Sequence, residues 1–152
     1  TQNNNFERLL EAIELNIKKH VIKDDVIVQA GFTKFTSNNM KIFDFMSKEK
    51  LSDLEDEADL IITHAGVGSI VSALKKGKKV IVVPRLKKYS EHVNNHQIQI
   101  ARRFEQEGYV KYVMNMKNLG KTIKIMQKFE PKPYLNEKSN VISIIENYID
   151  NN

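Results

Sequence analysis

The residues best suited to chemistry lie in the stretch LIITHAGVGSIVSAL, at positions 60–74. An apolar run ends at His64, and two glycines, Gly66 and Gly68, precede Ser69 at the start of a helical pattern. A strand, a glycine turn and a helix in this order present backbone N–H groups to a phosphate. The stretch therefore predicts a phosphate-binding turn, although two glycines alone also suit a tight turn required only for packing.

A second group of polar residues lies in the loop RLKKYSEHVNNHQ, at positions 85–97, after the next apolar run. Asn95, His96 and Gln97 end this loop where another helical pattern begins. Two simpler interpretations stay open at this point. Asn95 also suits a helix N-cap, and a single histidine at a strand end, such as His64, is packed or solvated more often than functional.

Alternating strands and helices must position these residues. Apolar spacing and capping residues predict helices over 6–20, 47–58, 69–76, 95–107, 118–129 and 141–149. Short apolar runs predict strands over 26–31, 42–46, 60–64, 79–84 and 109–113. This alternation favours an α/β fold, a Rossmann-like parallel sheet with helices on both faces. Ligands of such sheets bind outside the carboxyl ends of the strands, so 29–31, 64–69 and 85–97 are expected along one rim.

The chain divides into one domain over 1–130 and a segment over 131–152. TQNNNF precedes a helix directly, which predicts that a first strand lies upstream of Thr1. PKP at 131–133 is interpreted as a linker, and the apolar face of the helix at 141–149 suits either docking to a partner or packing on its own domain.

Composition excludes several classes of function. The 152 residues contain no Cys, which rules out disulfides, thiolate metal sites and thiol catalysis. The net charge of +5 favours anionic partners, but basic residues without interleaved aromatics argue against nucleic acid. The lysines at 75–79 also suit the end of a helix before Gly77. No apolar run approaches the roughly 20 residues of a membrane span.

Three motifs together resemble a known family: HAGVGS at 64–69, GKKVIVV at 77–83 and NHQ at 95–97. They are similar to the donor-binding, C-terminal half of the GT-B glycosyltransferases of family 28. The likeness is strongest to small stand-alone subunits, both of eukaryotic dolichol-linked UDP-GlcNAc transferases and of bacterial exopolysaccharide and capsule glycosyltransferases. It covers residues 1 to about 113 and is most specific over 59–109.

The resemblance implies a UDP-sugar donor and a role for each matching residue. Backbone N–H groups at Gly68 and Ser69 hold the diphosphate, and His64 donates to a phosphate oxygen as the catalytic residue. The remaining donor contacts that the resemblance implies are Thr1, Gln2, Gly31, Gly66, Asn95, His96 and Gln97. Glu91 and His92 either contact the donor sugar or keep the loop solvated. Ser72 stands where many family members carry a ribose-binding Glu, which weakens that contact.

The function implied is that of the donor-binding catalytic subunit of a two-component glycosyltransferase. A membrane-anchored partner subunit supplies the acceptor half and a lipid-linked sugar acceptor, so the chain is expected to be cytoplasmic and peripheral at the inner membrane face. No cofactor or metal is expected, because the sequence has no Asp-x-Asp motif. The alternatives are a UDP-sugar epimerase-like enzyme and a non-catalytic nucleotide-binding or regulatory module, which Ser72 favours.

Overall fold

The computed structural model describes residues 5–92 and 94–134. Its helices are α1 (Glu7–Lys18), α2 (Lys48–Glu57), α3 (Val67–Lys75), α4 (His96–Gln106) and α5 (Leu119–Met126), with 3-10 turns η1 (Lys87–Tyr89) and η2 (Met116–Asn118). Its strands are β1 (Ile27–Gln29), β2 (Lys41–Phe43), β3 (Leu60–Thr63), β4 (Lys79–Val82) and β5 (Lys111–Tyr112). The predicted alternation of strands and helices is therefore confirmed over the described residues.

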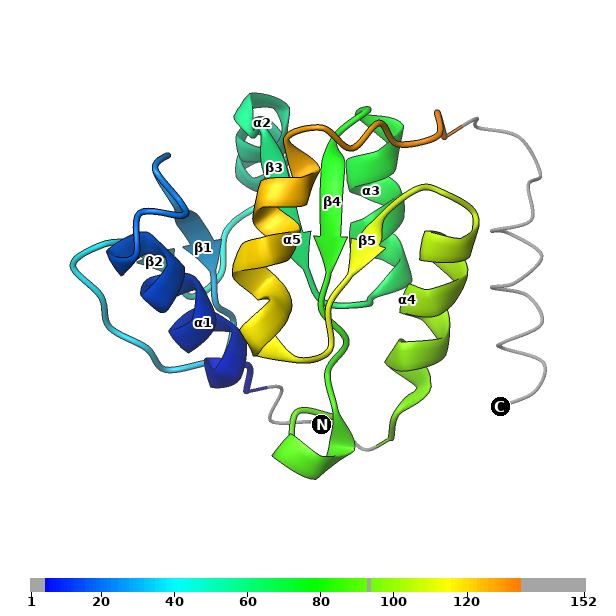
Figure 1. Cartoon of the computed structure of the whole chain (residues 1–152). Coiled ribbons are helices and arrows are strands. Elements are labelled where there is room, and N and C mark those ends of the chain that lie inside the picture. Colours follow the sequence, from blue (N-terminus) through cyan, green and yellow to red (C-terminus); the bar gives the residue numbers. More distant parts are fainter. Residues whose placement is uncertain (1–4, 93, 135–152) are drawn as a thin grey trace.

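All strand pairs are parallel, and they form two sheets, β1–β2 and β3–β4–β5. Figure 1 shows β1 on the side of β3 that is turned away from β4. One edge of β1 and one edge of β3 pair with no strand within the described part of the chain. The upstream strand expected from the sequence stays a prediction.

Helices cover both faces of the sheet, and β4 separates two apolar cores. Ile81 and Val83 pack into a cluster with α1 and α5, whereas Val80 and Val82 pack into a cluster with α3 and α4. This alternation is the period-two pattern of a strand that is buried on both faces. The Rossmann-like α/β class predicted from the sequence is thus confirmed.

Two helices differ in detail from the prediction. α3 begins at Val67 with Gly66 as its N-cap, rather than at Ser69. α2 is capped as predicted, since Ser47 Oγ accepts a hydrogen bond of 3.1 Å from Lys50 N, but it contains no buried residue. α2 therefore packs only partly against the domain.

The basic cluster at 75–79 has a structural explanation. Gly77 lies just beyond α3 with a φ of +72°, a conformation that favours glycine at a helix end. Lys76 Nζ contacts Ser52 O at 2.7 Å and pairs with Asp56 at 3.1 Å, which ties α3 to α2. Lys79 Nζ binds the carbonyl of Met126 at the end of α5. These contacts confirm the interpretation of the cluster as a helix end.

The PKP segment stays in contact with the domain. Lys132 N donates to Gly108 O at 2.9 Å, and the rings of Tyr134 and Tyr109 lie 5.5 Å apart, edge to face. The predicted helix at 141–149 lies outside the described residues, as do Thr1 and Gln2. No helix within the described ranges is long and apolar enough to span a membrane.

Candidate functional site

One side chain, Gln97, joins three loops at the carboxyl ends of the strands. Its Oε1 accepts hydrogen bonds from Ala65 N at 3.3 Å and from Arg85 N at 2.9 Å. Its Nε2 lies 3.3 Å from His64 Nδ1, and the residue is buried. The sequence predicted that Gln97 contacts the donor sugar. That contact stays a prediction, and in the structure the amide of Gln97 holds together the β3–α3 turn, the end of β4 and the start of α4.

These hydrogen bonds also determine which nitrogen of the neutral His64 ring carries the proton. Because Oε1 receives two backbone N–H donors, Nε2 must be the amide group that donates to His64 Nδ1. A neutral imidazole then carries its proton on Nε2. Burial, helped by the nearby charges of Arg85 and His92, lowers the pKa of His64 from 6.5 to about 4. At neutral pH, His64 is therefore an uncharged hydrogen-bond donor through Nε2–H.

The two glycines of the turn have different roles. A Cβ at Gly66 would fall 2.9 Å from His64 Nε2 and 3.0 Å from its Nδ1, so only glycine lets the imidazole lie against this backbone. A Cβ at Gly68 would have no heavy atom within 4 Å. Gly68 and Ser69 are exposed, and no side chain caps the N-terminus of α3. The helix start thus offers free N–H groups and the positive end of its dipole to an anion.

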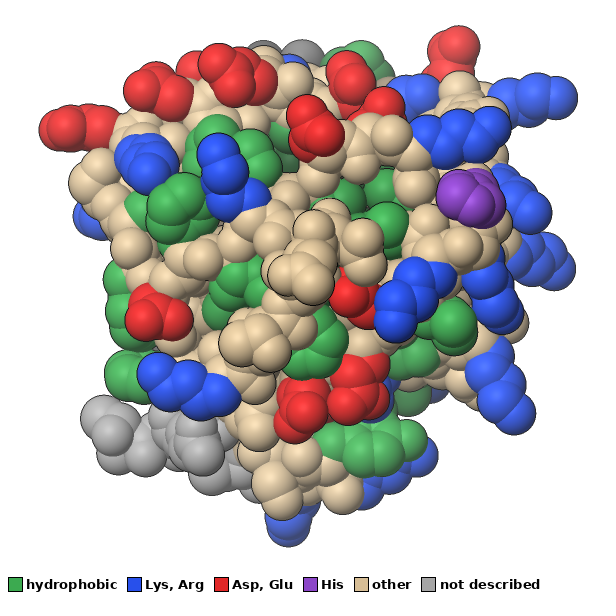
Figure 2. All heavy atoms as spheres, turned by 90° about the vertical axis from the view of Figure 1, so that its left-hand side faces the viewer, with side chains coloured by type: hydrophobic (Ala, Val, Ile, Leu, Met, Phe, Trp, Pro, Cys, Tyr) green, Lys and Arg blue, Asp and Glu red, His purple; other side chains and the backbone are tan. Residues whose placement is uncertain are grey.

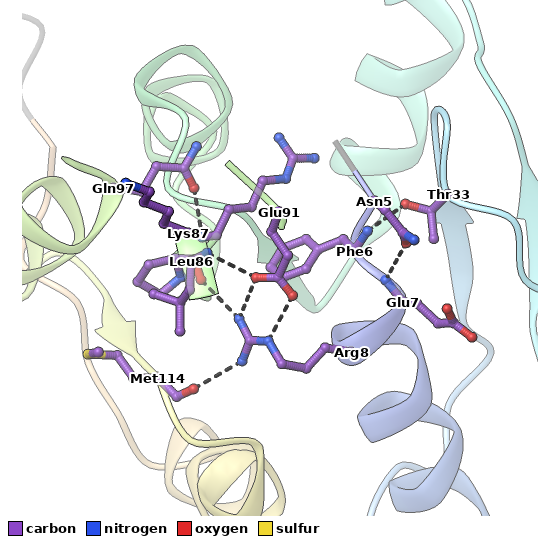
Figure 3. A network of polar contacts seen from close by, with 12 residues as sticks. Asn5, Phe6, Glu7, Arg8, Thr33, Leu86, Lys87, Glu91, Gln97 and Met114 are labelled. Atoms are coloured by element: carbon purple, nitrogen blue, oxygen red, sulfur yellow. Dashed lines mark hydrogen bonds and ion pairs between the residues drawn. The ribbon is translucent and has the colours of Figure 1, made fainter. Parts of the chain in front are cut away.

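The loop at 85–95 is held by its own polar residues, which corrects two expectations. Asn95 Oδ1 accepts from Lys87 N at 2.9 Å, so its side chain does not cap α4. His96 N is bound instead by Asn94 Oδ1 at 3.0 Å. Glu91 is 2% exposed, and its carboxylate pairs with Arg8 (Figure 3). Glu91 therefore does not keep the loop solvated, and its contact with the donor sugar stays a prediction.

Arg8, at the start of α1, is the residue that sequence reasoning missed. Its Nε and Nη2 donate to both carboxylate oxygens of Glu91 at 2.9 Å. Its guanidinium also donates to the carbonyls of Pro84 and Met114, at 3.1 and 3.0 Å, and lies 4.8 Å from the centre of the Tyr89 ring. Arg8 thus ties α1 to the loops after β4 and β5. Because Arg8 and Glu91 lie 83 positions apart in the sequence, no local pattern indicates this pair.

Two predicted contacts lie apart from this centre. Ser72 Oγ donates to Glu55 Oε1 of α2 at 3.2 Å, so its hydroxyl is bonded on the flank of α3. Gly31 follows β1 with a φ of +59° and donates to Asp44 O at 2.6 Å. The centre therefore consists of the α3 N-terminus, His64 and Gln97. The described residues contain no group of three or more His, Asp or Glu that suits a metal ion.

Similar proteins give this geometry a context. The model of the glycosyltransferase family 28 C-terminal domain matches residues 5–151. The UDP-N-acetylglucosamine transferase subunit ALG13 of Candida albicans is 31% identical over 104 residues, which make up 68% of this chain and 34% of that protein. The subunit of the same name from Saccharomyces cerevisiae is 43% identical over 68 residues, covering 45% of this chain and 31% of that protein. The human subunit is 35% identical over 78 residues, covering 51% of this chain and 6% of that protein.

An NMR solution structure of ALG13 is also similar, with 31% identity and a TM-score of 0.48. The match covers 74% of this chain and 54% of that one. The chain spans about a third or less of the length of the three relatives described above.

Proposed function

Because this chain belongs to the glycosyltransferase family 28 C-terminal domain family, we propose that it is the donor-binding catalytic subunit of a two-component glycosyltransferase. Its donor would be a UDP-sugar and its acceptor a lipid-linked sugar presented by a membrane-anchored partner subunit. The observation that carries this proposal is the neutral His64, with Nε2–H free to donate, beside the uncapped N-terminus of α3.

The proposed chemistry needs charge stabilisation on the departing nucleotide. As the acceptor oxygen bonds to the anomeric carbon, the bond from that carbon to the β-phosphate oxygen breaks, and the electron pair leaves with UDP. The N–H groups of Gly68 and Ser69 and the Nε2–H of His64 are suited to receive this charge. In this role, all three groups donate hydrogen bonds without transferring a proton.

The proton of the acceptor hydroxyl must go to another group. His64 Nδ1 is occupied by Gln97 Nε2, and His64 Nε2 already carries a proton. Neither nitrogen is therefore available as a general base. This distribution of roles supports a second subunit that supplies the base together with the acceptor.

N-acetylglucosamine is the sugar that we propose, because the similar proteins are named as UDP-N-acetylglucosamine transferase subunits. The same names favour glycan assembly over the exopolysaccharide or capsule synthesis that the loop sequence also suggested. A non-catalytic nucleotide-binding module is the second candidate, supported by Ser72, whose hydroxyl is bonded to Glu55.

A position at the membrane surface, reached through the partner, suits the charge distribution. Figure 2 shows Lys and Arg side chains along its right-hand edge, which is the front of Figure 1, where α1 and α5 lie. The exposed lysines on and beside α5 are Lys117, Lys121, Lys124 and Lys128. Such a face is attracted to anionic lipid headgroups, at about 1 kcal/mol for each basic residue close to the surface.

Calorimetry and a transfer assay test the proposal. The chain should bind UDP and UDP-GlcNAc, and the co-expressed pair of subunits should transfer GlcNAc to a lipid-linked sugar. His64→Asn in the pair should lower kcat by about 10- to 1,000-fold. The absence of nucleotide binding would refute the donor site. Binding without transfer by the pair would favour the regulatory module, and conversion of UDP-GlcNAc by the chain alone would favour an epimerase.

A further inference from the structure

A partly buried cation, Arg85, lies next to this centre, and its Nε has no hydrogen-bond partner in the described part of the chain. Among the described residues, Arg85 Nε is the one buried side-chain nitrogen or oxygen that makes no hydrogen bond. Burial lowers the pKa of Arg85, while the nearby charge of Glu91 opposes that effect. Guanidinium nevertheless stays charged at neutral pH. A buried, unsatisfied nitrogen is costly, and in native proteins it calls for an explanation such as an absent water, ion or ligand.

The nearest carboxylate does not neutralise Arg85, because it is committed elsewhere. Glu91 gives both of its oxygens to Arg8, and its Oε1 also accepts from Leu86 N at 3.0 Å. Arg85 itself lies with its guanidinium carbon 5.3 Å from the centre of the Phe6 ring, which provides no counter-charge. Arg8 therefore holds both oxygens of Glu91, and no carboxylate of the described residues is hydrogen-bonded to Arg85.

The backbone of Arg85 lies beside the turn that leads into α3. Arg85 N and Ala65 N both donate to Gln97 Oε1, so their backbones lie on either side of one oxygen atom. Ala65 directly precedes Gly66, the N-cap of α3. The charge of Arg85 also contributes to lowering the pKa of His64. A cation, an Nε2–H donor and a helix N-terminus therefore gather in one place.

We propose that Arg85 binds the diphosphate of the donor, and that Arg8 keeps it available by holding Glu91. The proposal rests on the proposed function, since it assigns a residue to the same donor site. Guanidinium forms paired hydrogen bonds with phosphate oxygens, and such a contact satisfies Nε at the same time. Arg85 then neutralises charge that His64, as an uncharged donor, only partly offsets.

Calorimetric titration of the full chain with UDP and with uridine tests the first part. Arg85→Met should weaken UDP binding by about 10- to 100-fold and leave uridine binding within about threefold. The UDP affinity of Arg85→Lys should lie between those of the wild type and Arg85→Met, because lysine keeps the charge but loses the planar guanidinium that pairs with two phosphate oxygens. Lys87→Met, which removes an exposed charge from the same loop, should leave the binding of both UDP and uridine unchanged. An equal loss of UDP and uridine binding, or no loss of either, would overturn the assignment.

Thermal unfolding without ligand separates a binding role from a structural one. Since Arg85 Nε makes no hydrogen bond with the described residues and a methionine can still pack on the Phe6 ring, Arg85→Met should leave the Tm unchanged or raise it by a few degrees. A Tm lowered by more than about 5 °C would show that Arg85 stabilises the fold, contrary to the proposal. If the wild-type chain binds neither UDP nor uridine, the proposed function itself fails. If the wild type binds UDP and the Arg85→Met variant binds it equally well, only the role of Arg85 fails.

The role of Arg8 is tested by a pair of variants. In Arg8→Met, Glu91 loses its partner and should pair with Arg85, so UDP binding should weaken by about tenfold or more. Adding Glu91→Gln removes the competing charge and should restore UDP binding to within about threefold of the wild type. A double variant that binds UDP as poorly as Arg8→Met would refute the proposal that Arg8 acts by holding Glu91.

Discussion

The protonation of His64 should make the stability of this protein depend on pH. In the unfolded chain, a histidine titrates with its ordinary pKa of about 6.5, whereas in the folded protein the pKa of His64 is about 4. Since a folded pKa below the unfolded pKa means that the unfolded chain binds the proton more tightly, the stabilisation is complete above pH 6.5 and is lost as the pH falls towards 4. The full difference between the two pKa values corresponds to about 3 kcal/mol of folding stability.

His64→Asn removes the titrating group while keeping an acceptor near the position of Nδ1 for Gln97. Between pH 7.5 and pH 4.5, the free energy of unfolding of the wild type should fall by about 2.5 kcal/mol more than that of this variant. Urea unfolding at both pH values gives the four free energies required. His20→Asn is the matched control, because His20 is exposed and has a φ of +61° that asparagine tolerates.

The control should keep the pH dependence of the wild type, since His64 is intact in it. An equal loss of stability in the wild type and in His64→Asn would refute the reasoning. An NMR titration gives a direct check, because the His64 ring should begin to protonate only well below pH 6. An imidazole that titrates above pH 6 would show that burial does not hold His64 neutral.

Two further predictions concern the helix that follows this turn. Gly66→Ala should lower the free energy of unfolding by about 1–3 kcal/mol, because its methyl group displaces the His64 ring. Gly68→Ala should leave the free energy of unfolding unchanged or raise it by up to about 1 kcal/mol, because the added methyl group meets open space in a helix. Urea unfolding measures both variants, and equal effects would contradict the prediction. Ser72→Glu should destabilise the chain by about 1–2 kcal/mol through repulsion by Glu55, which lies 3.2 Å from the Ser72 hydroxyl. Adding Glu55→Gln should restore most of this loss, and a double variant as unstable as the single one would show that repulsion is not the cause.

Much of the fold was predictable because it follows from local patterns. The period of the apolar residues located the described helices and strands, and Ser47 and Gly77 marked a helix start and a helix end through their own chemistry. The rim was also predictable, because parallel strands place the residues that follow them at one edge. His64 and Gly66 meet there because they are close in sequence and share one turn.

The partners of the polar side chains were not predictable in the same way. Gln97 and Glu91 carry groups that suit a sugar, and nothing in the sequence shows that backbone N–H groups and Arg8 already occupy them. Such pairings depend on which long-range neighbours the fold brings together. Arg85 was visible only as one of several basic residues, and its lack of a hydrogen-bond partner is a property of the packed structure.

The charge of His64 depends on the side chain at position 97, which a single nucleotide change in the gene can convert from an amide to a carboxylate. Glutamine and glutamate codons differ by one nucleotide, and Gln97→Glu would put a carboxylate 3.3 Å from His64 Nδ1 in place of an N–H donor. The carboxylate would draw a proton onto Nδ1 and raise the pKa of His64, so that the ring becomes a cation at neutral pH. An NMR titration of this variant should find His64 protonated above pH 6.5. A neutral and a cationic version of the same candidate site would then be separated by one mutational step.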